Sequence, residues 1–153
     1  MIFISAFTFG PIVGGFAGGI GSSLSDFFGG FGVFAPFTLV IKGLEGYVAG
    51  LICQRAGEKK RALLLAWAAG SVVMVLGYFL AESYFISLVF GSSDFTGIAA
   101  ASGELPFNII QVVGGGIVGI PVSLGIKYAI RSTAFSSRIL GQSKGPSKDS
   151  KSN

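Results

Sequence analysis

The sequence contains no histidine and a single cysteine, Cys53. A disulfide within the chain needs two cysteines, and the usual zinc and haem sites need cysteine or histidine ligands, so these are excluded. A Ser-His-Asp triad and an H-E-x-x-H site cannot form without histidine. The chain also has no G-x-x-x-x-G-K-[ST] phosphate loop, so it is not an ATPase of that class. We therefore expect neither an enzyme nor a cofactor, and we interpret Cys53 as a small apolar residue at a helix end.

Charge is also scarce. Charged residues make up 12% of the chain, hydrophobic residues make up 51%, and the mean hydropathy is +0.75. Soluble domains carry about 25% charge, so this composition indicates lipid as the solvent. The 25 glycines agree with it, because glycine lets helix backbones approach closely inside a membrane. We predict an all-α integral membrane protein. The net charge of +4 is explained better by membrane orientation than by binding of nucleic acid.

Four stretches are apolar enough to be membrane spans, at residues 11–28, 36–53, 62–88 and 106–130. Residues 1–10 are apolar but too short, and we interpret them as a partial span. The predicted architecture is a helical bundle over residues 1–135, followed by a disordered cytoplasmic tail over residues 136–153. A chain end inside hydrocarbon leaves unsatisfied polar groups. We therefore expect that Met1 is not the true start, or that the gene is clipped, and that one or two spans precede it.

The charges of the connecting segments predict the orientation. Residues 54–61 and the C-terminal end carry nearly all the lysines and arginines, whereas residues 22–35 and 83–105 carry only acidic charge. The positive-inside rule places the basic segments in the cytoplasm and the acidic ones outside a prokaryotic cell membrane. The C-terminus is then cytoplasmic.

Ionisable and amide side chains of three predicted spans converge in the outer halves, and the inner halves of these spans are nearly all apolar. Ionisable residues within a membrane are costly and usually functional. Helical spacing places Tyr78 and Glu82 on one face, and a second face carries Glu104 with two amides. We predict a substrate-binding pocket, open to the outside and closed toward the cytoplasm, formed by Lys42, Glu45, Tyr78, Glu82, Glu104, Asn108 and Gln111.

A simpler alternative is that these groups bond one another. Lys42 and Glu45 are three residues apart on a helix and can form an ion pair. Asn108 and Gln111 can form hydrogen bonds between helices. Both interpretations remain open from the sequence.

Glycine lines one face of the first full span. Gly14, Gly15, Gly18 and Gly19 form or adjoin this small face, and larger apolar side chains fall opposite. Such a face suits close helix packing, either inside the chain or against a partner subunit at a docking site.

Three segments resemble the S component of an energy-coupling factor (ECF) transporter, of the riboflavin type and related ones. They are FGPIVGGFAGGIGSSLSDFFGGFGVFAPFTLVIKGLEGYVAGLI (residues 9–52), VMVLGYFLAE (residues 73–82) and GELPFNIIQVVGGGIVGIP (residues 103–121). The more specific motifs are the Gly-Pro that opens the first full span, the Lys-Gly-x-x-Gly at residues 42–46 and the Glu-x-Pro-Phe-Asn at residues 104–108.

The resemblance implies a six-helix membrane protein that binds one vitamin at its outer face. It also implies partners, namely a transmembrane coupling subunit and two ATPase subunits, and delivery by toppling of the S component in the membrane. Family binding sites draw on the outer parts of the last three helices, where the polar residues above fall. Family members have a first helix and a complete second helix before the Gly-Pro motif, and this sequence lacks the first of these.

The resulting hypothesis is the substrate-binding subunit of an ECF transporter that captures a water-soluble vitamin from outside. Its ligand would be held by the polar residues and by aromatics such as Phe34, Phe37, Tyr47, Tyr78 and Phe107. The phenylalanine content favours a flat heterocycle such as riboflavin. Alternatives are an ion-coupled secondary carrier that uses Lys42, Glu45 and Glu82 as a relay, and a membrane scaffold that does not transport.

Lysine labelling of intact cells tests the orientation. We expect a membrane-impermeant amine reagent to leave Lys59 and Lys144 unmodified, because the charge bias places both inside. The same reagent should modify both after the cells are broken open. Modification of either lysine in intact cells would show that the protein is inverted.

Overall fold

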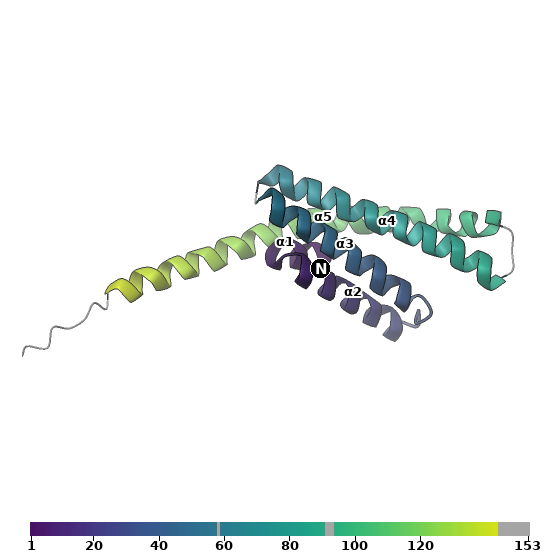
Figure 1. The fold of residues 1–153 in the computed structure, drawn as a ribbon, viewed down its shortest axis with the longest axis horizontal. Helices are drawn as coiled ribbons and strands as arrows, with labels where there is room; N and C mark the ends of the chain where they lie inside the picture. The colour runs from purple at the N-terminus through teal and green to yellow at the C-terminus, as the bar shows by residue number, and fades with distance from the viewer. Residues whose placement is uncertain (58, 91–93, 144–153) are drawn as a thin grey trace, which may run out of the picture.

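The computed structural model describes residues 1–57, 59–90 and 94–143 as five α-helices. They are α1 (Ile2–Phe9), α2 (Pro11–Phe28), α3 (Ala35–Ala56), α4 (Lys60–Phe90) and α5 (Asp94–Ser143). Consecutive helices pack side by side in one bundle, and the C-terminal part of α5 projects beyond it (Figure 1). Within the described ranges there is no strand, so the predicted all-α class is confirmed.

Three of the helices are long and apolar enough to cross a membrane: Ala35–Ala56, Lys60–Phe85 and Gly97–Thr133. The expected first full span matches α2 in its bounds, but this glycine-rich helix is not among the three. Its five glycines and three serines lower its hydropathy even though it packs within the bundle.

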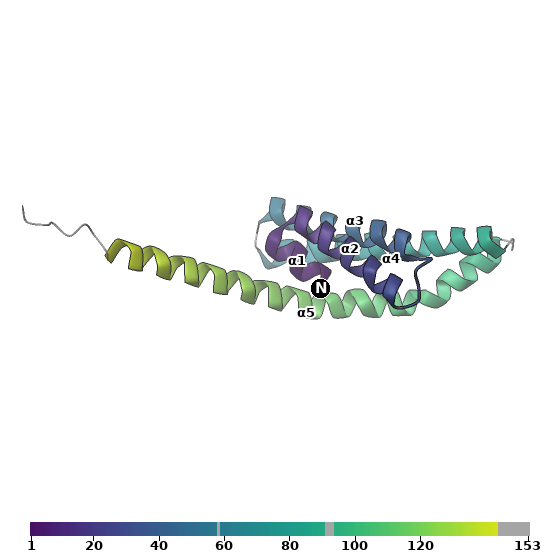
Figure 2. The same ribbon diagram turned by 90° about the horizontal axis from the view of Figure 1, so that it is seen from below.

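The last two helices are longer than the sequence analysis predicted. The span expected at residues 62–88 is α4 with two further residues at each end, whereas α5 begins at Asp94, inside the segment expected to connect the last two spans. Pro106 was expected to open a helix and instead lies inside α5. Proline removes one backbone hydrogen bond of a helix and bends it, and α5 curves along its N-terminal part in Figure 2. At the other end α5 includes residues 136–143, which were assigned to the disordered tail, and residues 144–153 lie outside the described residues.

The short helix α1 folds back against α2. Gly10 joins them with a φ of 88°, a backbone conformation that glycine adopts readily, and Pro11 opens α2. A Cβ on Gly14 would meet Ala6, and one on Gly18 would meet Ile2, so the two helices run antiparallel in close contact. α1 also packs against α3 and α5. It therefore fills the space between α2 and α5 at one end of the bundle.

The core around α1 is apolar. Its main cluster consists of Phe3, Ala6, Phe7, Ala49, Cys53, Leu63 and Ala66. A smaller cluster of Ile41, Met74 and Val112 lies farther along the bundle. Trp67 joins α4 to α5 by donating its indole N–H to the carbonyl oxygen of Val112 over 2.8 Å. Cys53 is buried in the main cluster at the end of α3, as expected.

Glycine determines how closely α2 and α3 approach. A Cβ on Gly46 would collide with the carbonyl of Gly14, and one on Gly50 would lie 2.6 Å from Pro11 Cα. A Cβ on Gly19 would lie 2.7 Å from the carbonyl oxygen of Leu39. The small face of α2 thus packs inside the chain, which is the first of the two alternatives for it. Gly14, Gly18 and Gly19 are buried there, and only Gly15 of the expected docking set stays partly exposed.

Replacing Gly46 with alanine tests this packing. The added methyl group meets backbone atoms that cannot rotate away, and overpacking of this kind typically costs about 1–3 kcal/mol. We expect Gly46→Ala to lower the midpoint of thermal unfolding in detergent. Gly21→Ala is the matched control, because nothing lies within 4 Å of the position of its Cβ. Equal midpoints for the two variants would contradict the close approach of α2 and α3.

Candidate functional site

A cavity of about 450 Å³ lies at the end of the bundle opposite α1, where α2, α3, α4 and α5 each contribute side chains. Ligand-binding cavities usually measure about 300–1,000 Å³. The cavity is lined by Asp26, Phe31, Phe34, Thr38, Tyr78, Glu82, Glu104, Phe107, Asn108 and Gln111. It therefore combines acidic, amide and aromatic groups in one space.

Helical spacing explains how these side chains meet. Tyr78 and Glu82 are one turn apart on α4, and Glu104, Asn108 and Gln111 follow one another along one face of α5. The sequence analysis predicted both faces, and the structure brings them together around the cavity. The curved N-terminal part of α5 carries Glu104 alongside the end of α4.

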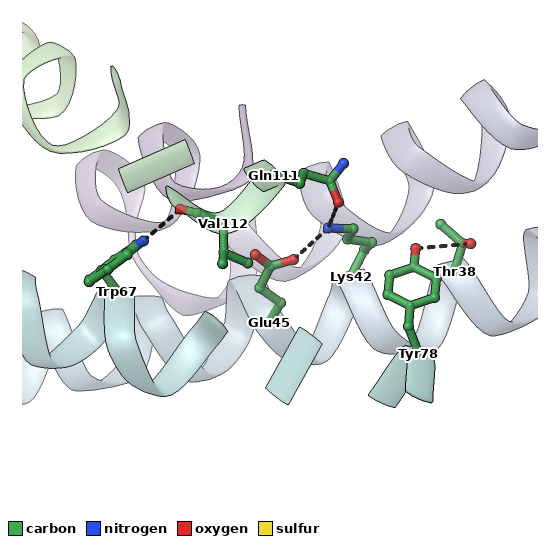
Figure 3. A network of polar contacts seen from close by, with 7 residues as sticks. All are labelled: Thr38, Lys42, Glu45, Trp67, Tyr78, Gln111 and Val112. Carbon is green, nitrogen blue, oxygen red and sulfur yellow. Dashed lines mark hydrogen bonds and ion pairs between the residues drawn. The ribbon is translucent and has the colours of Figure 1, made fainter. Parts of the chain in front are cut away.

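Lys42 and Glu45, the other two predicted binding residues, do not line the cavity. Their side chains are buried on α3, where the ammonium nitrogen (Nζ) of Lys42 lies 3.0 Å from a carboxylate oxygen of Glu45. This is the ion pair of the simpler alternative. Lys42 also donates a hydrogen bond of 3.1 Å to Gln111 Oε1, which connects the pair to the cavity wall (Figure 3). Direct contact of either residue with a substrate remains a prediction.

Other cavity residues were not selected from the sequence. Asp26 was treated only as a loop charge, and Phe31 and Thr38 were not singled out. Thr38 accepts a hydrogen bond of 3.1 Å from the hydroxyl of Tyr78 (Figure 3). The i, i+4 relation of Thr38 to Lys42 could have indicated a shared face. By contrast, nothing in the sequence indicates that the turn containing Phe31 folds over the cavity.

The predicted aromatic residues divide among three places. Phe34, Tyr78 and Phe107 line the cavity. Phe37 packs beside it against the ring of Phe85 at 5.5 Å, and Phe85 also contacts Phe34 at 5.4 Å. Tyr47 lies elsewhere, in an apolar groove between α2 and α3. The cavity thus has an aromatic wall supported by ring contacts outside it.

Glu82 has a buried carboxylate oxygen, Oε2, in the cavity region without a hydrogen-bond partner among the described residues. The carboxyl group of Glu104 lies in the same cavity and interacts with that of Glu82. A buried acceptor without a donor is costly, so Glu82 favours a ligand that donates hydrogen bonds. Among the described residues there is no cluster of potential metal ligands.

The fold defines a polytopic membrane protein with a polar and aromatic cavity at one end. The sequence matches the family of the ECF-type riboflavin transporter S component over residues 1–128. It is also 41% identical over 119 residues to a protein of Pyrococcus woesei described as an uncharacterized protein in gap 3'region, covering 78% of this chain and 72% of that one. The chain belongs to the ECF riboflavin transporter S component family. It is a membrane substrate-binding subunit and works with the membrane and ATPase components of an ECF transporter.

The buried ion pair gives a prediction for stability. Lys42→Met leaves the Glu45 carboxylate buried without its partner, and breaking a buried pair in this way costs roughly 3–5 kcal/mol. Lys42→Met/Glu45→Met removes both charges and fills the space with apolar side chains, which is often neutral or stabilising.

We therefore expect a clearly lower midpoint of thermal unfolding for the single variant and a midpoint near that of the wild type for the double variant. Purified proteins in detergent give the comparison. An equal loss in both variants would mean that the isolated charge is not what destabilises the single one.

Proposed function

We propose that the chain captures riboflavin from outside the cell in the cavity between α2, α3, α4 and α5. The observation that supports this most strongly is the composition of that cavity, which has an aromatic wall, two amides and a buried, unpartnered carboxylate oxygen of Glu82. Binding sites for small molecules combine apolar walls with a few polar groups that orient the ligand.

The chemistry of riboflavin suits these groups. Its ring system is flat and largely apolar, so it can stack on Phe34 and Phe107. The ribityl hydroxyls and the ring N–H are hydrogen-bond donors, which the carboxylates of Glu82 and Glu104 can accept. The pyrimidine edge carries carbonyl acceptors, which the amides of Asn108 and Gln111 can satisfy.

The proposed orientation places this cavity outside. The acidic residues Asp26, Glu82 and Glu104 gather at the cavity end. The basic residues Arg55, Lys60 and Lys127 belong to the opposite end, where α3 ends and α4 begins. This separation along the bundle supports a cytoplasmic C-terminus through the positive-inside rule.

The partners we propose are one transmembrane coupling subunit and two ATPase subunits, as the resemblance implies. The glycine face of α2 contributes little to docking on them, because α1 and α3 cover most of it. Of its four glycines, Gly15 is the one that a neighbouring subunit could reach.

Direct binding measurements test the function. We expect the purified protein to bind riboflavin with micromolar or tighter affinity, measured by quenching of flavin fluorescence. Glu82→Ala should weaken binding roughly 10- to 100-fold, because a hydrogen bond to a charged group contributes about 1.5–3 kcal/mol.

Tyr84→Phe is the matched control, since Tyr84 is on the same helix but is 70% exposed and outside the cavity. A wild-type protein that binds no flavin, or a Glu82→Ala variant with wild-type affinity, would contradict the proposal.

A further inference from the structure

The ammonium group of Lys42 is held by its protein neighbours. Its ammonium group donates to Glu45 at 3.0 Å and to Gln111 at 3.1 Å, and it lies 5.6 Å from the centre of the Tyr78 ring, whose face attracts cations. The residue is 4% exposed. An ammonium group has three N–H donors. Two of them are used in these hydrogen bonds, and Lys42 is not among the residues that line the cavity. Lys42 therefore acts on the cavity through Gln111 rather than by contact with the substrate.

The contact with Lys42 determines which end of the Gln111 amide faces it. An ammonium group only donates hydrogen bonds, so the amide must present its oxygen. The amide nitrogen then points away from Lys42, as Figure 3 shows. Nε2 has no hydrogen-bond acceptor among the described residues, and Gln111 lines the cavity. The cavity wall at Gln111 consequently offers N–H donors.

The acidic part of the cavity has the opposite character. The carboxylates of Asp26, Glu82 and Glu104 only accept hydrogen bonds when ionised. A ligand with donors at one end and acceptors at the other fits this cavity in one direction only. If the Gln111 amide were rotated by 180°, its oxygen would face the ligand. Both parts of the cavity would then offer acceptors.

We infer that Lys42 is a positioning residue, which holds the Gln111 amide so that its N–H groups face the ligand and select a carbonyl acceptor there. The inference rests on the proposed function, because it assigns this acceptor to the pyrimidine edge of riboflavin. Glu45 contributes by neutralising the ammonium that makes the contact.

The test uses analogues that exchange an acceptor for a donor. In two riboflavin analogues, the carbonyl at position 2 or position 4 of the pyrimidine ring is replaced by an amino group. When a donor of the analogue faces the N–H groups of Gln111, neither the analogue's donor nor the Gln111 amide has a hydrogen-bond acceptor. We expect the wild type to bind at least one analogue roughly 10- to 100-fold more weakly than riboflavin.

Removing the positioning contact should relax this selectivity. In Lys42→Met/Glu45→Met the amide can turn and present its oxygen, so the ratio of the two dissociation constants should fall below about fivefold. Gln111→Ala removes the amide that Lys42 is inferred to position. Adding the same double replacement to Gln111→Ala should therefore leave the ratio of the two dissociation constants unchanged. A purely structural role for Lys42 would alter the affinity for both ligands in parallel and leave the ratio at its wild-type value, which would overturn the inference.

A second variant keeps the test decisive if the double variant fails to fold. Gln111→Glu keeps an oxygen toward Lys42 but offers the ligand only acceptors, so it should prefer the amino analogue to riboflavin. Continued preference for riboflavin would refute the assignment. A wild-type protein that binds no flavin overturns the proposed function itself, whereas flavin binding with an unaltered ratio in these variants overturns only the role of Lys42.

Discussion

The binding end of the molecule depends on one buried charge. Lys42 lies between the two apolar clusters of the bundle, and its ammonium group joins α3 to α5 through Gln111. A charge in such a place is stable only when it is paired and hydrogen-bonded, and Glu45 on the next turn of α3 supplies the partner. The pair therefore lies outside the cavity lining and contacts it through Gln111, a residue of its wall.

The end of the bundle opposite the cavity is closely packed. Glycines bring the backbones of α2 and α3 together, and α1 occupies the space between α2 and α5. α1 lies at one end of the bundle, where it packs against α2, α3 and α5. At the opposite end the side chains of four helices surround a cavity instead of a core.

Helical periodicity and charge predicted which of these residues share a helix face, but they did not predict how deeply each side chain is buried. The faces that carry Tyr78 with Glu82 and Asn108 with Gln111 follow from spacing alone. Spacing also permits the pairing of Lys42 with Glu45, but it cannot show whether the pair faces a ligand or lies beneath it. That depends on the distance between α3 and α5. The extent of α5 was missed for a related reason, since Pro106 resembles a helix start in sequence and becomes a bend only when a neighbouring helix supports it.

The same buried pair bears on how a bound ligand is delivered. The cavity is separated from the basic end of the bundle by the Lys42–Glu45 pair and by the apolar cluster around Phe3 and Phe7. Passage along the bundle axis would break a buried ion pair and displace core side chains, each at a cost of several kcal/mol. Movement of the whole subunit relative to its transport partners leaves both intact. The structure therefore favours a binding subunit that moves as a unit over a carrier with a relay of ionisable groups through its centre.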